Sequence, residues 1–192
     1  MNLNIQEIFE EGRTCNSFSS KEVPDSLLKE IYDLAKLGPT SANCNPLRII
    51  FVRNDEAKAK LLSCLMEGNV AKTREAPVTA IFAEDRKFYT KMPDLFPHNK
   101  DFGKMYENNE LLAKDTASRN SVLQAAYFMM VARGKGLDCG PMSGFFGEKL
   151  NEEFFSGTTY KVNFICNLGF KSGKPEYPRL PRLNFEESCE IL

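Results

Sequence analysis

The chain has 192 residues, enough for one domain that buries roughly 70% of its unfolded surface. A hydrophobic share of 42% and a charged share of 27% are those of a soluble globular protein, so disorder is not expected. A net charge of -1 and the lack of a long basic run argue against nucleic-acid binding.

The amino-terminal part of the chain predicts two helices. A short helix is expected over residues 3–11 and ends near Gly12. A second opens at Val23-Pro24-Asp25 and runs to about Leu37, where Gly38 ends it. Its apolar positions share one face: Leu27, Leu28, Ile31, Leu34 and Ala35.

Three apolar runs predict strands. The first two, Leu47 to Val52 and Val78 to Ala83, are near-continuous, which indicates burial on both faces. A helix over Glu56 to Leu65 separates them, and residues 161–169 form the last strand. These strands are too few and too unevenly spaced for a regular βαβ repeat. We therefore expect an α+β fold, with a single domain over residues 1–192.

The remaining segments predict further helix and an extended tail. Residues 85–115 are charged, aromatic and weakly patterned, and we expect an irregular helical excursion there that could act as a lid. The stretch from Asn120 to Arg133 is apolar almost all round, which predicts a fully buried helix in a core or a dimer interface. The proline-rich segment 174–192 is expected to be extended.

Several absences narrow the function. The amino terminus lacks the features of a signal peptide, and nothing approaches the roughly 20 apolar residues that span a bilayer. We therefore expect a cytoplasmic protein with no membrane partner. Six cysteines form no C-x-x-C pair, and His98 is the only histidine. A histidine-based metal site and a Ser-His-Asp triad are both disfavoured.

The segment from Gly38 to Pro46 is a dense, neutral polar loop with prolines at both ends. It contains Ser41 and Asn43, and its hydroxyls and carboxamides suit a planar heteroaromatic ligand whose edge alternates donors and acceptors. A well-capped turn is the alternative for this loop taken alone.

Two basic segments suit a phosphate group. Arg13 is followed by Thr14 and, two positions later, by Asn16. Near the carboxyl end, Arg179 and Arg182 lie on a proline-stiffened segment. An arginine presents a planar fork of donors that matches phosphate, although a solvated surface is the alternative for both segments.

Two further segments suit a flavin. Asn69 and Lys72 are three positions apart, which places a carboxamide and an ammonium group on one helical face. Such a pair matches the pyrimidine edge of a flavin, although an exposed helix start is the alternative. Residues 139–145 include Ser143 and Gly144, and backbone there could approach a ligand closely. A tight strand-to-helix connection is the alternative.

Taken in order, these elements resemble the nitroreductase family of FMN-dependent oxidoreductases over almost the whole chain. The matching motifs are Arg13-Thr14, Pro39 to Asn43, Asn69-x-x-Lys72, Pro141 to Phe145 and Arg182-Leu183. Within the family, residues 38–44, 68–80, 95–98, 136–145 and 177–183 are most similar to the malonic semialdehyde reductases, also called 3-hydroxypropanoate dehydrogenases.

The resemblance implies a three-layer sandwich with a mixed or antiparallel central sheet, an intertwined homodimer and two FMN sites at its interface. It also implies the roles of the site residues. Arg13, Thr14, Asn16, Arg179 and Arg182 would hold the phosphate and ribityl chain. Ser41 and Asn43, from the partner subunit, would line the flavin. Asn69, Lys72 and Asn120 would meet the pyrimidine edge, with Ser143 and Gly144 beside the reactive N5.

The sequence departs from the family pattern at a few positions. Many relatives carry basic residues where this chain has Gly12 and Asn16. Asn45 replaces a frequent glutamine, and Ser143 stands where several nitro-reducing members have glutamate.

The implied reaction is ping-pong hydride transfer from NADPH or NADH, through flavin N5, to a small electrophile such as malonic semialdehyde. Lys72 would stabilise the reduced ring electrostatically. His98 is a candidate proton donor to an aldehyde oxygen, and an exposed surface histidine is the alternative.

Three other functions remain open from the sequence. The first is a general nitro or quinone reductase of the same family, and the second is an FMN-binding protein without turnover. The third is a thiol enzyme that uses Cys44 or Cys139, which would need neighbouring cations to activate it.

Overall fold

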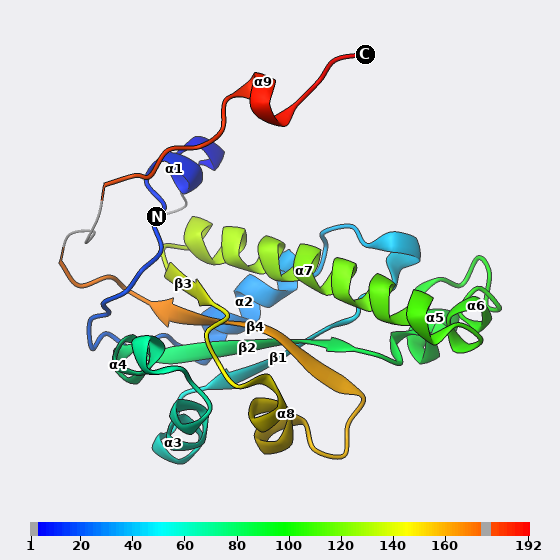
Figure 1. Ribbon diagram of the computed structural model, residues 1–192, viewed down its shortest axis with the longest axis horizontal. Helices are drawn as coiled ribbons and strands as arrows, with labels where there is room; N and C mark the ends of the chain where they lie inside the picture. The colour runs from blue at the N-terminus through cyan, green and yellow to red at the C-terminus, as the bar shows by residue number, and fades with distance from the viewer. Residues whose placement is uncertain (1–3, 174–177) are drawn as a thin grey trace.

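The computed structural model describes residues 4–173 and 178–192 (Figure 1). Its centre is one antiparallel sheet in the order β1-β2-β4-β3. The strands are β1 (Leu47–Val52), β2 (Val78–Asp85), β3 (Asp138–Met142) and β4 (Tyr160–Gly169). The three predicted strands and the α+β class are confirmed. The additional strand, β3, comes from the segment that contains Gly140 and Pro141, residue types that are poor predictors of a strand.

The two near-continuous apolar strands are not buried to the same extent. Every residue of β2 is buried, as predicted, because β1 and β4 flank it in the sheet. Only Val52 of β1 is fully buried, and its other residues are half-buried. The prediction of burial on both faces is therefore wrong for β1, because that strand lies at the edge of the sheet.

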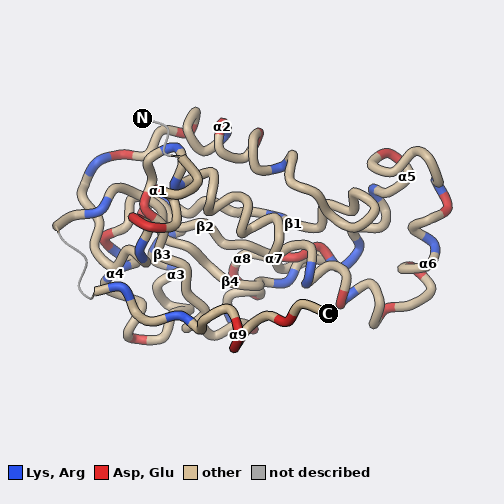
Figure 2. The backbone as a smooth tube through the Cα atoms, turned by 90° about the horizontal axis from the view of Figure 1, so that it is seen from above, with Lys and Arg blue, Asp and Glu red and all other residues tan. Residues whose placement is uncertain are grey.

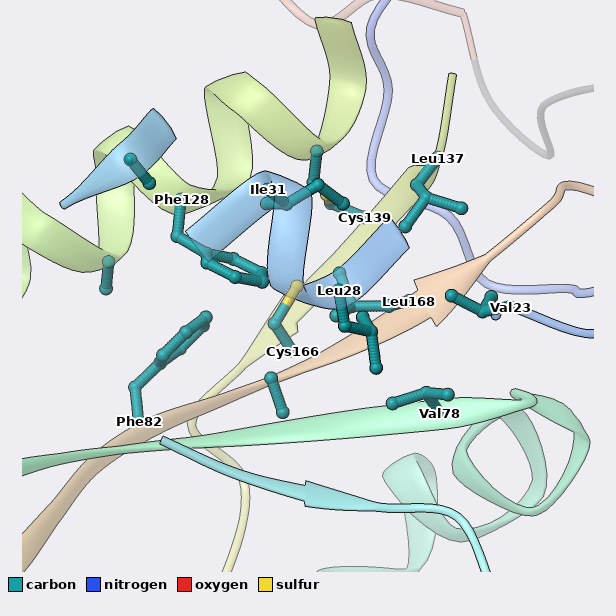
Figure 3. Close-up of a cluster of buried hydrophobic side chains, with 14 residues drawn as sticks. Val23, Leu28, Ile31, Val78, Phe82, Phe128, Leu137, Cys139, Cys166 and Leu168 are labelled. Atoms are coloured by element: carbon teal, nitrogen blue, oxygen red, sulfur yellow. The ribbon is translucent and has the colours of Figure 1, made fainter. Parts of the chain in front are cut away.

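Two helices, α2 (Asp25–Ala35) and α7 (Glu110–Gly134), cover one face of the sheet (Figure 1). Leu28 and Ile31 of α2 pack against Phe128 of α7 and Phe82 of β2, as Figure 3 shows. These apolar contacts hold the upper layer on the sheet.

Helix α7 is longer and less buried than predicted. It begins at Glu110, where the side chain of Asn109 accepts a hydrogen bond from the Leu112 amide. Only one of its faces meets the sheet. Val122 and Leu123 on another face are 44% and 41% exposed. The prediction of a fully buried helix is therefore wrong for one copy of the chain.

Three helices form the third layer on the opposite face of the sheet: α3 (Asp55–Ser63), α4 (Glu67–Glu75) and α8 (Gly147–Phe155). Leu61, Leu150 and Phe155 fill the core between this layer and the sheet. The three-layer arrangement implied by the resemblance is confirmed.

The predicted helical excursion lies at one end of the molecule, on the right of Figure 1. It contains η2 (Phe88–Lys91), α5 (Met92–Leu95) and α6 (Lys104–Glu107). Phe88, Met92 and Tyr106 form a small core of their own with Cys44. Its helical character is confirmed, and its action as a lid stays a prediction.

Short helices lie near both termini, α1 (Ile5–Glu10) and α9 (Phe185–Ser188), and another, η1 (Ser41–Asn43), lies in the loop between α2 and β1. The predicted extended tail is interrupted by α9, whose amino end is capped by Asn184. Residues 174–177, where that tail was predicted to start, lie outside the described residues, as does residue 3 of the first predicted helix. Between residues 4 and 173 and from 178 onward, no helix has the length and apolarity to cross a membrane.

Candidate functional site

A cavity of about 610 Å³ collects basic side chains from three separate segments. We call it the basic cavity. Its polar lining consists of Arg13, Thr14, Asn16, Arg133, Arg179 and Arg182. Arg13, Thr14 and Asn16 follow the end of α1, and the segment with Arg179 and Arg182 lies beside that end. Arg133 lies in the last turn of α7. All five residues predicted for a phosphate site are therefore brought together, and no described lining residue is acidic.

Backbone carbonyls at the end of α1 position two of these arginines. Arg179 Nη2 donates to the carbonyls of Phe9 and Glu10 at 2.5 and 2.6 Å. Arg13 Nη1 donates to the carbonyls of Glu10 and Gly12, both at 2.9 Å. Carbonyls at a helix carboxyl end lack intrahelical partners and favour cations. The end of α1 therefore holds both guanidinium groups at the cavity.

The loop after α1 is fixed to the edge of the sheet. Thr14 forms a parallel bridge with Cys139 of β3, and the Cys15 amide donates to the Cys139 carbonyl at 3.0 Å. Gly140 allows this approach, because a Cβ there would lie 2.4 Å from the Cys15 carbonyl oxygen. One end of the basic cavity is thus held against β3.

The four arginines of the basic cavity have unused hydrogen-bonding capacity. None of them pairs with a carboxylate in residues 4–173 or 178–192. In Figure 2, the basic residues of the segment that leads to α9 are coloured blue. A guanidinium has five N–H donors, so donors remain for an anion after the carbonyls are satisfied.

A second group of predicted site residues lies just beyond the other end of β3. Asn69 Nδ2 donates to the Gly144 carbonyl at 2.9 Å, and the Met66 amide donates to the same oxygen at 3.0 Å. Lys72 follows Asn69 by about one turn of α4, and Ser143 is exposed beside Gly144. Asn69, Lys72, Ser143 and Gly144 are called the amide-lysine site below.

A buried polar chain anchors α4 to the sheet under the amide-lysine site. Thr79 of β2 donates to Asn167 of β4 at 2.7 Å, and Asn167 donates to Thr73 of α4 at 3.1 Å. All three side chains are fully buried. Because each buried polar group has a partner, this series of hydrogen bonds holds α4 on the sheet and so fixes the positions of Asn69 and Lys72.

The polar loop has an unusual backbone. Ala42, Asn43 and Asn45 have φ angles of 47, 52 and 43°, in the left-handed region that residues other than glycine rarely adopt. The Ser41 amide donates to Asn120 Oδ1 at 2.8 Å, and Asn120 Nδ2 donates to the Thr116 carbonyl at 2.8 Å. The sequence predicts neither Asn120 as the support of this loop nor its strain, which its side-chain contacts hold in place.

Gln124, one turn further along α7, also holds the loop and was missed by the sequence analysis. Its Nε2 donates to Asn45 Oδ1 at 2.9 Å, and its Oε1 accepts from the Leu47 amide at 3.0 Å. The only available signal was a single carboxamide within the apolar run of residues 122–132. Asn43 Nδ2 donates to the Leu95 carbonyl at 2.7 Å and so joins the loop to the excursion.

The predicted site residues do not all meet within one chain. The loop leads into β1 at one edge of the sheet, whereas Gly144 of the amide-lysine site follows β3 at the opposite edge. Neighbouring strands are about 4.8 Å apart, so three strand spacings, roughly 14 Å, separate the two edges. Ser41 and Asn43 therefore lie at the edge of the sheet opposite to the amide-lysine site of their own chain, and Asn120 is bound to the Ser41 amide.

His98 lies in the excursion and is exposed. Its ring contacts that of Phe96 edge-on, with the ring centroids 5.6 Å apart.

Arg133 is the other functional candidate that the sequence analysis missed, because a basic residue in the last turn of a helix is typical of an ordinary carboxyl-terminal cap.

Five of the six cysteines are buried and have the environment of structural thiols, and Cys189 is exposed. Burial raises the pKa of Cys15 and of Cys44 to about 11. A hydrogen bond with Cys139 and burial raise the pKa of Cys166. Figure 3 shows Cys139 and Cys166 inside the core. A thiol in such surroundings is not a nucleophile at neutral pH, which argues against the thiol-enzyme alternative.

Alkylation with iodoacetamide at pH 8 is expected to label one cysteine per native chain, the exposed Cys189. Thiols with a pKa of about 11 carry almost no thiolate below pH 9, so Cys15 and Cys44 should react only as the pH approaches 11 or after unfolding. Intact-mass spectrometry measures the labelling, and Cys189→Ser should abolish it. Labelling of Cys44 in the folded protein at pH 8 would contradict this assignment.

Within the described part of the chain, no cluster of three or more histidine, cysteine, aspartate or glutamate residues could hold a metal ion.

Comparisons with known proteins agree with this architecture. The sequence model of the Nitroreductase family matches residues 10–170. A protein of Cupriavidus pinatubonensis, provisionally named an NADH dehydrogenase/NAD(P)H nitroreductase, is 47% identical over 189 residues, which are 97% of this chain and 96% of that protein.

Two solved structures share the fold. A Bacillus subtilis protein described as a nitroreductase superposes with a TM-score of 0.89 at 22% identity, over 97% of this chain and 98% of its own. An Exiguobacterium sibiricum protein, described as a nitroreductase in complex with FMN, has a TM-score of 0.87 at 21% identity, over 98% and 97% of the two chains.

Proposed function

This chain belongs to the nitroreductase family, and from that premise we propose that it transfers hydride from NADPH or NADH, through bound FMN, to a small electrophile. The observation that carries the proposal is the arrangement along β3. A cavity with four arginines and no described acidic lining residue lies at one end of this strand, and a carboxamide beside a lysine lies just beyond the other.

The residues present fit FMN. Its phosphate is an anion that arginine forks bind well, and the basic cavity offers Arg13, Arg179 and Arg182 for it. Thr14 and Asn16 line the same cavity and can hydrogen-bond the ribityl hydroxyls. These five residues are proposed to hold the cofactor's tail.

The amide-lysine site is proposed to hold the flavin ring. Asn69 can pair with ring carbonyl and imide groups, and Lys72 places a positive charge beside the pyrimidine edge. Ser143 and the closely packed backbone of Gly144 would lie beside N5. The sheet and α4 exclude water from below this site, because the Thr79–Asn167–Thr73 chain is fully buried.

When bound, FMN supplies the two-electron chemistry, because its N5 accepts hydride from NAD(P)H and passes it to a second compound. The role of the polypeptide would be to bind the FMN, to orient it and to stabilise its reduced ring. The half-buried Lys72 has no carboxylate partner among the described residues, so its charge remains available to stabilise a negatively charged ring. No side chain needs to act as a nucleophile, in agreement with the unreactive thiols.

A homodimer is proposed to complete the site. Ser41 and Asn43 lie at the edge of the sheet opposite to the amide-lysine site of their own chain, and Asn120 is bound to the Ser41 amide. A second copy could bring its own loop to that site. The exposed Val122 and Leu123 of α7 would then be buried between the subunits, which is favourable for apolar side chains.

We propose a small semialdehyde, such as malonic semialdehyde, as the physiological acceptor, with 3-hydroxypropanoate as the product. This proposal rests on the sequence resemblance alone. The name of the Cupriavidus relative favours the second candidate, a general nitro or quinone reductase of the same family. An FMN-binding protein without turnover is the third.

One experiment separates these candidates. The purified protein should be yellow with flavin absorbance, bleach on anaerobic addition of NADPH or NADH, and recover its colour when the acceptor is added. Fast recovery with malonic semialdehyde supports the semialdehyde reductase, and recovery only with nitro compounds or quinones supports the second candidate. A yellow protein that neither donor bleaches would contradict any reductase.

His98→Gln is expected to change turnover with an aldehyde by less than about twofold. The side chain is exposed, and its only described aromatic contact is with Phe96. Exposed polar side chains outside a site usually have small effects. Steady-state kinetics with the aldehyde and with a quinone would check this. A large loss with the aldehyde alone would instead support the proton-donor role of His98.

A further inference from the structure

We propose that Arg133 is a phosphate-binding residue that α7 contributes to the basic cavity. This inference rests on the proposed function and adds a ligand that the sequence motifs do not contain. Arg133 lies in the last turn of α7 and lines the cavity together with Arg13, Arg179 and Arg182. The residue is half-buried.

Glycine at position 12 makes room for this guanidinium. A Cβ on Gly12 would lie 2.8 Å from Arg133 Nη1 and 3.2 Å from its Cζ. It would also lie 2.4 Å from the Ile8 carbonyl oxygen. A side chain at position 12 and the observed position of Arg133 are therefore mutually exclusive. The cation that faces the cavity at this point comes from α7.

The hydrogen bonds of Arg133 leave most of its donors unused. Its one side-chain bond among the described residues is from Nη2 to the Arg13 carbonyl, at 3.4 Å. This is at the long end for a hydrogen bond, whereas Arg13 and Arg179 each make two bonds of 2.5 to 2.9 Å to carbonyls around the end of α1, with a third from Arg179 at 3.3 Å. A capping role alone would not require Arg133 to line a cavity with three other arginines.

The convergence of four positive charges points to an anion. The three segments that bring them are far apart in the sequence, and like charges in one cavity repel. A phosphate group offers several acceptor oxygens with a charge of about -1.5 to -2, and it can bind all the segments at once. The phosphate of FMN is the ligand group that this chemistry fits.

Comparing FMN with riboflavin, which lacks the phosphate, tests the role of Arg133. Flavin fluorescence titrations of the flavin-free protein at low salt give both dissociation constants. We expect Arg133→Met to weaken FMN binding by about five- to tenfold, the loss of one partly exposed charge-assisted hydrogen bond, and to leave riboflavin binding unchanged. Arg133→Lys should retain most of the FMN affinity, and Lys29→Met, an exposed charge on α2, should change neither constant.

The outcomes separate a ligand from a structural cap. If Arg133→Met weakens FMN and riboflavin equally, or changes neither, Arg133 does not bind phosphate. The thermal midpoint of the flavin-free variant shows whether its fold is intact, and the lysine variant still tests the charge if the methionine variant is unstable. A wild-type protein that binds neither flavin would contradict the proposed function itself, which is a different result.

Discussion

Gly144→Ala is expected to weaken FMN binding by about 10- to 100-fold while the fold is retained. A Cβ at position 144 would lie 2.3 Å from Asn69 Nδ2, so the Asn69 side chain must swing away. Its hydrogen bond to the Gly144 carbonyl would be lost, and the carboxamide would no longer face the flavin. Losing the hydrogen bonds of one positioned amide costs about 1–3 kcal/mol, which gives this range.

A matched control lies three residues away. Gly147→Ala adds the same methyl group, but its nearest neighbour would be the Phe145 ring at 3.9 Å, an ordinary contact. That variant should bind FMN like the wild type. The double variant Gly144→Ala/Asn69→Ala should bind no more weakly than Gly144→Ala, because both changes remove the same interaction. Additive losses would show that Gly144 acts independently of Asn69.

Lys72→Met is expected to make the flavin harder to reduce. A positive charge near the pyrimidine edge stabilises the negatively charged reduced ring more than the neutral oxidised ring. Unit charges in contact interact by about 4 kcal/mol near a protein surface, and exposure to water reduces this further. We expect the midpoint potential to fall by about 30–60 mV and reduction by NADPH to slow by about tenfold.

Redox titration and stopped-flow reduction measure these two changes. Lys72→Arg keeps the charge and should recover much of both. Arg74→Met removes an exposed charge from the same helix and should leave the potential within about 10 mV of the wild type, because solvent screens it. An unchanged potential in Lys72→Met would remove the electrostatic role of this lysine.

The fold could be predicted where a segment carries a strong local pattern. The apolar runs that became β1 and β2 have the predicted boundaries within two residues. The extent of α7 and the strand β3 were not predictable in this way. The first ten residues of α7 contain four charged side chains and no long apolar run. Strand β3 is held mainly by pairing with β4, a long-range contact that no local sequence pattern records.

The candidate site could be predicted only as far as its residues belong to motifs. Arg13 and Arg182 were predicted to converge on the strength of the resemblance, and they line one cavity. Arg133 and Gln124 lie within a helical pattern that explains them as cap and core, so only their three-dimensional neighbours reveal a further role. The left-handed backbone of Ala42 has no sequence signal, because alanine normally avoids that region, whereas asparagine, as at Asn43, adopts it more readily.

Sedimentation velocity, followed both in the protein band and at the flavin wavelength, tests most directly whether two copies of this chain enclose FMN. We predict that flavin absorbance and protein travel together as one dimeric species with about one FMN per chain. Flavin that sediments with a stable monomer, or free of the protein altogether, would contradict the account.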